Sequence, residues 1–429
     1  MIEILESTMQ QARQRLRDGH PARADRILSS REAVAFKSRD AAVLKELWPT
    51  LAQSRSERRA QAAAGRIDLH THTTASDGKL TVEKSVCRHF HQGQILINDH
   101  NIIDSLADAR QLVSEHDLVL DVFLGIEVIC AHDRRTFEFM AIAPTLSDAF
   151  VDLCREHRQM WDRACELFLA DLIACDDFFD NPLWQKIRQD YQVGGEFEPV
   201  IEKYNIIRNR ISQSDKDYQD YLRGEQTFDL GEHYADWGLA ANDTLPMSSH
   251  RFYASMRSYA ANAYPDELGD WFHYEPLARR FKAAGCLISH NHPNYWDDDF
   301  IGELPYALQE KWIRDWAARS VIDALEVWSP PFASKRVPHY WEQVAKECNL
   351  IPMAGTDCHD GLEQQRGGQL ENHPEIPPLI YAKLTEQAVA MAHVEKKPWL
   401  AYERWREVLD IDYAHAEALD RISTIIHEL

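Results

Sequence analysis

The sequence predicts an α/β protein in which seven strands alternate with helices and are enough to close into a barrel. Seven short β-like runs each end in polar residues, and they span residues 66–72, 94–100, 120–128, 136–143, 285–292, 324–329 and 351–359. Stretches with helical spacing separate most of these runs, for example residues 81–90, 274–285 and 334–349. Strands that alternate with helices form a parallel sheet with crossover connections.

Three further segments are predicted to be helical. Residues 1–60 carry apolar positions at three- and four-residue steps, which predicts a helical N-terminal extension. Residues 146–270 interrupt the barrel of residues 66–365, and a structureless loop of that length is uncommon in a compact domain. We therefore interpret 146–270 as a helical insertion. It follows the fourth strand. If it leaves a parallel barrel at the carboxyl ends of the strands, it is a candidate lid over the pocket at that end. Residues 380–429 are predicted to form a helical cap that packs on the barrel with the N-terminal helices.

The charge balance argues against some partners. The chain has 429 residues, with 47 Lys and Arg against 69 Asp and Glu, and a formal net charge of −22. Sequence-independent binding of long nucleic acid needs a basic face that displaces counterions, so no long nucleic acid is expected as a partner. A nucleotide or an oligonucleotide end at a metal site is still compatible with this charge.

The composition also bears on the compartment. No apolar run approaches the ~18 residues that a membrane span needs, and residues 1–16 lack the apolar core of a signal sequence. The eight cysteines contain no CxxC pair, a pattern typical of reduced thiols rather than of a disulfide framework. We expect a cytoplasmic protein without a membrane partner. The oligomeric state stays open.

The first strand ends in a candidate metal-binding pair. His70 and His72 are two residues apart, so in an extended segment both imidazoles face the same side. Asp77 follows in the loop TTASDGK, where Gly78 permits a sharp turn. One such pair is weak support for a metal site, because two ordinary histidines can produce it.

The recurrence of such residues at other strand ends makes the interpretation stronger. They are Asp99, His100, Glu127, His290, His292, Asp357 and His359. In parallel α/β barrels the functional groups gather at the carboxyl ends of the strands, and carboxylates crowded there repel one another unless cations are present. Mixed nitrogen and oxygen ligands without thiolate suit Zn²⁺, Mn²⁺ or Fe²⁺. The number of candidate ligands leaves room for two or three ions, two of them bridged by a carboxylate such as Glu127.

These motifs resemble those of the PHP (polymerase and histidinol phosphatase) superfamily. The matching motifs are, in order, HTHTTASDG, a strand ending in DH, GIE, HNHP and GTDCHD, and they cover residues 66–145 and 275–365. The resemblance implies a distorted seven-stranded, TIM-like β/α barrel with two or three divalent metal ions. It is closest to the stand-alone metal-dependent phosphoesterases of that superfamily, and it says nothing about the three helical segments.

The resemblance also implies a ligand set, which is His70, His72, Asp77, His100, Glu127, His292, Asp357 and His359. His292 is preferred to His290 because it precedes Pro293, as the family's ligand does. Glu138 stands where the family usually has a histidine, so it is a candidate ligand that would favour Mn²⁺ or Mg²⁺. His132 is the second candidate for that position.

The expected reaction is metal-assisted hydrolysis of a small phosphorylated metabolite or nucleotide. Asp357 and His292 are the candidate catalytic residues, with Asp357 or a neighbouring histidine as the proton relay. Arg134, Arg135 and Lys79 are candidate substrate-binding residues, although solvated surface charges would have the same sequence pattern.

Cys358 could in principle be a nucleophile, but its parity turns it away from the ligands, so we expect a small buried residue. Two other functions stay open. One is an amidohydrolase-like hydrolase that cleaves C–N or carboxyl-ester bonds with the same metals. The other is a non-enzymatic PHP regulatory module.

Overall fold

The computed structural model describes residues 2–65, 67–76, 78, 80–89, 93–116, 118–132, 135–174, 264–293, 306–328, 338–358 and 375–429. The predicted insertion of residues 146–270 is therefore described only at its two ends.

Seven strands form one sheet in the chain order β1 to β7. They are β1 (Ile67–Thr71), β2 (Gln94–Ile97), β3 (Asp121–His132), β4 (Arg135–Ala143), β5 (Leu287–His290), β6 (Ala324–Trp328) and β7 (Ile351–Ala354). The two ends of the sheet meet, because Thr71 forms a parallel bridge with Cys358, just beyond β7. Together with the helices around it, the sheet is a distorted seven-stranded β/α barrel, and this confirms the predicted fold class.

One strand departs from the predicted parallel order. β4 is antiparallel to both β3 and β5, whereas every other pair of neighbouring strands is parallel. The prediction of a wholly parallel sheet was wrong here. The reason is the short connection from His132 to Arg135, which can only turn the chain back, since a parallel neighbour needs a crossover of a dozen residues or more.

Most of the remaining helices cover the outside of the sheet. They are α4 (Val82–His89), α5 (Asp104–Glu115), α6 (Asp148–Ala174), α11 (Pro265–Phe272), α12 (Tyr274–Ala283), α13 (Tyr306–Ala318) and α15 (Pro338–Glu347). Apolar side chains of α5, α12, α13 and α15 join those of the strands in the largest buried cluster.

The insertion leaves the barrel from an unexpected side. We expected it to depart at the carboxyl ends of the parallel strands, but the antiparallel β4 ends at the opposite rim. Helix α6 then carries the chain back, because His157 in α6 hydrogen-bonds to Asn101, which follows β2, at 2.9 Å. Most of the predicted lid of residues 146–270, namely 175–263, is outside the described part of the chain, so its role as a lid stays a prediction.

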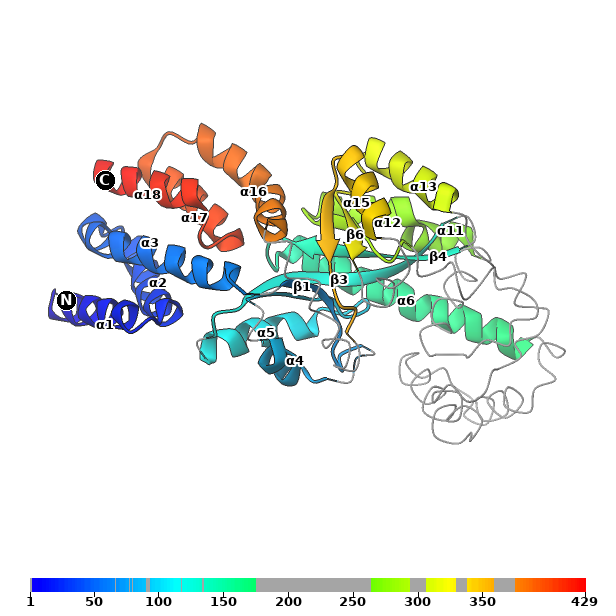
Figure 1. The fold of residues 1–429 in the computed structure, drawn as a ribbon, viewed down its shortest axis with the longest axis horizontal. Helices are drawn as coiled ribbons and strands as arrows, with labels where there is room; N and C mark the ends of the chain where they lie inside the picture. The colour runs from blue at the N-terminus through cyan, green and yellow to red at the C-terminus, as the bar shows by residue number, and fades with distance from the viewer. Residues whose placement is uncertain are drawn as a thin grey trace.

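The terminal segments form one helical layer. Its members are α1 (Ile2–Arg17), α2 (Pro21–Ser38), α3 (Ala41–Ala63), α16 (Ile376–Val394), α17 (Pro398–Ile411) and α18 (Ala416–Glu428). These helices share a buried cluster of their own that includes Leu28, Trp48 and Tyr402. Figure 1 shows them gathered at one end of the molecule, away from the far end of α6.

Helix α16 closes the bottom of the barrel. Its residues Ile376, Ile380 and Leu384 pack in one buried cluster with strand residues such as Phe123 and Met353. Phe123 and Glu127 are four residues apart on β3 and so face the same side of the sheet. The side of β3 that faces the barrel interior is therefore apolar at Phe123, near the end that α16 closes, and acidic at Glu127, towards the opposite end.

Among the described residues, no helix combines the length and the hydropathy that a membrane-spanning segment requires.

Candidate metal centre

Two buried histidines at the end of β1 begin the site. The Nε2 atoms of His70 and His72 lie 3.2 Å apart, and both side chains are fully buried. Gly355 makes room for them: a Cβ atom there would lie 2.1 Å from the Cβ atom of His70. Only glycine therefore allows the chain after β7 to come this close to β1.

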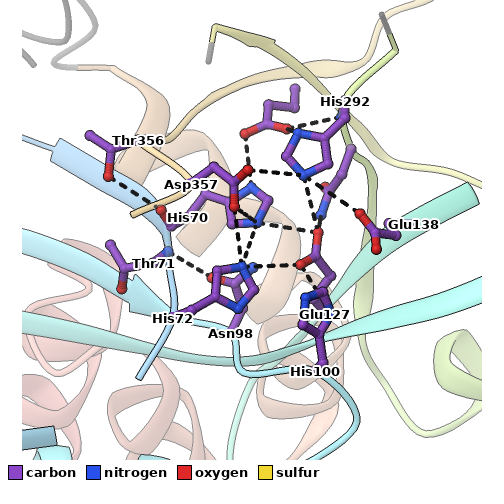
Figure 2. A network of polar contacts seen from close by, with 12 residues as sticks. His70, Thr71, His72, Asn98, His100, Glu127, Glu138, His292, Thr356 and Asp357 are labelled. Carbon is purple, nitrogen blue, oxygen red and sulfur yellow. Dashed lines mark hydrogen bonds and ion pairs between the residues drawn. The ribbon is translucent and has the colours of Figure 1, made fainter. Parts of the chain in front are cut away.

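Glu127 on β3 lies at the centre of the site (Figure 2). The nearest distances from its carboxylate oxygens to ring nitrogens are 3.2 Å for His70, 3.2 Å for His72, 3.4 Å for His100 and 3.4 Å for His292. One carboxylate thus contacts four imidazoles from three separate parts of the chain. This is the geometry of a carboxylate that can bridge two cations.

Asp357 and Glu138 extend the cluster on two sides. The Asp357 carboxylate lies 3.4 Å from His70 and 3.3 Å from His72. Glu138 lies 3.8 Å from Nε2 of His292. It comes from the first half of β4, and this half reaches the rim because β4 is antiparallel. The structure therefore brings Glu138 into the cluster, and its role as a ligand stays a prediction.

Glu326 on β6 was missed by the sequence analysis. Its two carboxylate oxygens lie 2.9 Å from Nδ1 of His70 and 3.1 Å from Nδ1 of His292. The signal was present, since Glu326 is a carboxylate in the middle of the apolar strand ALEVW, where only a partnered acid is expected. A carboxylate on Nδ1 leaves Nε2 of both rings facing the centre and fixes their orientation.

The electrostatics of the cluster follow from burial and from the opposite charges. Burial alone would lower the pKa of His70, but Glu127, Glu326 and Asp357 outweigh it and raise that pKa well above its ordinary value. The same balance raises the pKa of His292 to about 9. Burial alone would raise the pKa of Glu127, yet the neighbouring histidines hold it well below its usual range. The site therefore strongly favours positive charge next to Glu127.

This donor set fits divalent metal ions. Four overlapping sets have all their ligand atoms within 4.8 Å of one another, and they are His70–His72–Asp357, His70–His292–Glu326, His72–His100–Glu127 and Glu127–Glu138–His292. They offer imidazole nitrogens and carboxylate oxygens, the donors that suit Zn²⁺, Mn²⁺ and Fe²⁺. The predicted number of two or three ions stays a prediction.

Two residues of the site have strained backbones. His292 has a φ of 44° and Asp357 a φ of 49°, in the left-handed region that non-glycine residues seldom adopt. The backbone N–H of His292 donates to Glu326 at 3.0 Å, which helps to hold this conformation. Such strain concentrates at functional sites, where the surrounding contacts over-determine the geometry.

A second layer of buried carboxylates holds the loops that carry the ligands. Asp68 accepts hydrogen bonds from the backbone N–H and the hydroxyl of Thr356, at 2.9 and 2.7 Å. Asp99 accepts from the N–H and the hydroxyl of Thr73, at 2.7 and 2.8 Å, and from the Ser76 hydroxyl. Asp99 therefore shapes the loop after β1, whereas His100 beside it enters the cluster.

The other predicted residues fall outside this cluster or outside the described residues. Four predicted residues lie outside the described residues, and they are Asp77, Lys79, Arg134 and His359. The structure describes only the backbone of Arg135, at the start of β4.

Two histidines considered as alternatives lie elsewhere. His290 packs between Phe137 and Trp316 and hydrogen-bonds to Tyr274 at 3.0 Å. Burial, with His292 and His132 adding to it, lowers the pKa of His290 to about 3. His132 lies edge-on against Trp316. None of the candidate ligand sets formed by the described residues includes either histidine.

Cys358 is buried, as expected.

Comparison with known proteins gives partial matches. No family model matches the chain. It is 43% identical over 63 residues to the 5'-3' exoribonuclease Rnm of Escherichia coli and 41% identical over 63 residues to that of Salmonella typhimurium. Each match covers 14% of this chain and 22% of the relative, so the chain spans about a fifth of the length of these curated relatives.

Solved structures resemble the chain at low identity. An amidohydrolase from Chromobacterium violaceum has a TM-score of 0.41 at 17% identity, over 70% of this chain and 89% of that one. A Bifidobacterium adolescentis protein proposed to be a metal-dependent phosphoesterase has a TM-score of 0.39 at 16% identity, over 70% and 89%. A two-domain protein from Bacteroides vulgatus, containing a predicted PHP-like metal-dependent phosphoesterase, has a TM-score of 0.32 at 13% identity, over 70% and 53%.

The strand order and the rim cluster agree with the five sequence motifs: the fold of this chain is a distorted seven-stranded β/α barrel with a cluster of imidazoles and carboxylates at one rim.

Proposed function

We propose that the protein is a metal-dependent phosphoesterase of the PHP type, which hydrolyses a small phosphorylated metabolite or nucleotide. The observation that carries this proposal is the contact of one buried carboxylate, Glu127, with four imidazoles at the rim of the barrel. Neither Glu127 nor Glu326 is paired with a lysine or an arginine among the residues that the structure describes. Cations from solution are the natural complement of such a site.

Divalent ions held there would lower the pKa of a bound water and offset the charge of phosphoryl oxygens. Glu127 and the imidazoles around it would hold these ions close together. Glu326 keeps Nε2 of His70 and His292 turned towards them, through its contacts with both Nδ1 atoms. The ligands named here are neutral imidazoles and carboxylates, so the positive charge of the site would come from the bound metal ions. A site that holds these ions would accept an anionic substrate.

Asp357 and His100 lie on the side of the site that is open to solvent. Their side chains are 11% and 10% exposed, whereas those of His70, His72 and Glu127 are at most 1% exposed. Substrate and solvent therefore reach the cluster past Asp357. This position suits the predicted role of Asp357 as the group that moves a proton to or from the leaving oxygen.

The partial match to an exoribonuclease supports phosphoester chemistry, because a ribonuclease cleaves phosphodiester bonds. The net charge of −22 disfavours a long nucleic acid. We therefore place nucleotides, short oligoribonucleotides and phosphorylated metabolites in the substrate range, bound at the rim with the phosphoryl group against the cluster.

The test is a metal analysis of the purified protein together with a panel of phosphomonoesters, phosphodiesters, carboxyl esters and amides. His72→Gln should remove a donor from the cluster and abolish turnover of phosphate esters. His393→Gln is a matched control, because His393 lies exposed on α16, and it should leave turnover unchanged.

Turnover of amides or carboxyl esters alone would favour the amidohydrolase-like alternative. Bound metal without turnover of any compound in the panel would favour a regulatory module. Either result would contradict the proposal.

A further inference from the structure

A second cavity lies at the closed end of the barrel. Its volume is about 390 Å³, and it is lined by the helical layer, α5 and the start of β3. Small-molecule sites commonly have volumes of roughly 300 Å³ and above. Asp121 and Glu127 are six residues apart on β3, so this cavity is about 20 Å from the metal centre at ~3.3 Å per residue.

Three arginines from three helices line this cavity. They are Arg26 of α2, Arg58 of α3 and Arg110 of α5. They meet there although the chain as a whole carries a formal charge of −22. Guanidinium groups offer several donors in a fixed plane, and this plane matches the oxygens of phosphate or carboxylate groups.

Two of the acids that line the cavity, Asp25 and Asp121, are already paired. Asp25 lies 3.0 Å from Arg58 and 3.0 Å from Arg55. Asp121 lies 3.1 Å from Arg59 and accepts a hydrogen bond from the Tyr413 hydroxyl at 2.7 Å. Among the described residues, neither carboxylate forms a hydrogen bond or an ion pair with Arg110.

Arg110 lines the cavity without a direct polar partner among the described residues. It is exposed to solvent, and among the described residues no hydrogen bond or ion pair of its side chain exists. Partial burial of its guanidinium and, less strongly, the nearby charge of Arg58 lower the pKa of Arg110, although Tyr381 and Asp121 act in the opposite direction. The buried Nε–H of Arg58 also lacks a hydrogen-bond acceptor among the described residues. Both observations point to an anionic ligand in the cavity.

The other walls determine what else this ligand carries. Apolar side chains of Val113, Leu118, Leu120, Val122 and Ile411 line the same cavity. A bare inorganic anion would leave this apolar surface in contact with water, whereas an organic anion would cover it. Asp410 also lines the cavity, and burial raises its pKa.

We propose that this cavity is a second binding site, separate from the metal centre, for a small organic phosphate whose anionic group contacts Arg110 and Arg58. The ligand would touch α2, α3, α5 and the segment that joins α17 to α18. It would thereby link the helical layer to the barrel. This proposal does not depend on the reaction catalysed at the rim.

The experiment is calorimetric titration of the metal-loaded, full-length protein with three probes. Phenylphosphonate carries an apolar ring and has no hydrolysable ester bond, inorganic phosphate lacks the ring, and malonate is a carboxylate dianion. We expect phenylphosphonate to bind most tightly. Arg110→Gln should weaken this binding about tenfold, the scale of one lost charge-assisted contact. Arg155→Gln, an exposed arginine on α6, should change nothing.

Hydrogen exchange then locates the bound probe. Protection of α2 and α5 by phenylphosphonate in the wild type, and its loss in Arg110→Gln, would support the proposal. Protection confined to β1 and residues 98–101 would mean binding at the metal centre alone and would overturn it. Equal affinity in Arg110→Gln, no saturable binding at millimolar concentration, or tighter binding of malonate than of phenylphosphonate would also overturn it.

Discussion

The two ends of the barrel both bury charged groups, but they balance them differently. At the closed end each buried carboxylate has an arginine partner: Asp121 pairs with Arg59, and Asp25 pairs with Arg55 and Arg58. At the open rim the described partners of Glu127 and Glu326 are imidazoles and amide groups. The carboxylates of the closed end are neutralised within the chain, whereas those of the rim depend on protonated histidines or on metal ions.

This contrast separates a structural network from a functional one. Arg59 lies over the rings of Tyr381 and Tyr413, 4.1 and 4.6 Å from their centroids, and also pairs with Asp412 at 2.8 Å. It thereby ties α3 to α16 and to the segment before α18. Charges balanced in this way stabilise an arrangement of helices. An arrangement of acids around imidazoles instead favours binding of a cation.

Replacement of the central carboxylate should have the largest effect. Glu127→Gln removes the charge shared by four imidazoles, so metal content should fall. Turnover of phosphate esters should decrease by about a thousandfold or more, the scale of losing a central electrostatic group. Elemental analysis and steady-state kinetics measure both. A folded variant with wild-type metal content would show that Glu127 does not hold the ions.

At the closed end the same kind of change should affect stability instead. Asp121→Ala leaves Arg59 with Asp412 as its remaining acid, and breaking a buried pair costs about 3 kcal/mol at the lower end of the usual range. Urea unfolding measures this loss, and the folded variant should keep its metal content.

The control for this change is Asp152→Ala. It removes an exposed acid that pairs with Arg155, and it should alter stability by less than about 0.5 kcal/mol. Equal effects of the two substitutions would contradict a stabilising role of the buried network.

Glu326→Gln tests whether a carboxylate behind the histidines orients them. The amide keeps the shape but removes the negative charge that faces Nδ1 of His70 and of His292, so metal affinity should fall about 10- to 100-fold. Competition with a chelating dye measures the affinity. Glu386→Gln, at an exposed acid on α16, should leave it unchanged, and an unaltered affinity in Glu326→Gln would exclude this orienting role.

The smallest effect is expected within the helical layer. Tyr402→Phe removes the hydroxyl that donates to Glu32 at 2.6 Å, while Arg406 still pairs with Glu32 at 2.7 Å. Loss of a hydrogen bond to a charged group should reduce the free energy of unfolding by about 1.5 kcal/mol. Urea unfolding would reveal it, and stability equal to that of the wild type would show that Arg406 alone satisfies Glu32.

The sequence alone was enough to predict most of the strands and the convergence of the motif residues at one rim. His70, Glu127, His292 and Asp357 lie far apart in the chain, but each ends or follows an apolar run that the sequence shows, although β3 continues beyond Glu127 to His132. The parity argument also held for Cys358, which is buried. Their role as metal ligands remains a prediction that the experiments above address.

The direction of β4 and the part played by Glu326 were decided by the tertiary structure. The residues of a strand indicate that it is extended and buried, but its pairing with both neighbours decides its direction. The antiparallel direction of β4 places Glu138 at the rim. For the same reason the insertion begins at the opposite end of the barrel. The local sequence pattern indicates which residues at a fixed spacing are apolar and which are charged. It does not record which distant side chains will share a low-dielectric space. The partners of Glu326 and the cavity around Arg110 could therefore be identified only after the barrel and the helical layer were assembled.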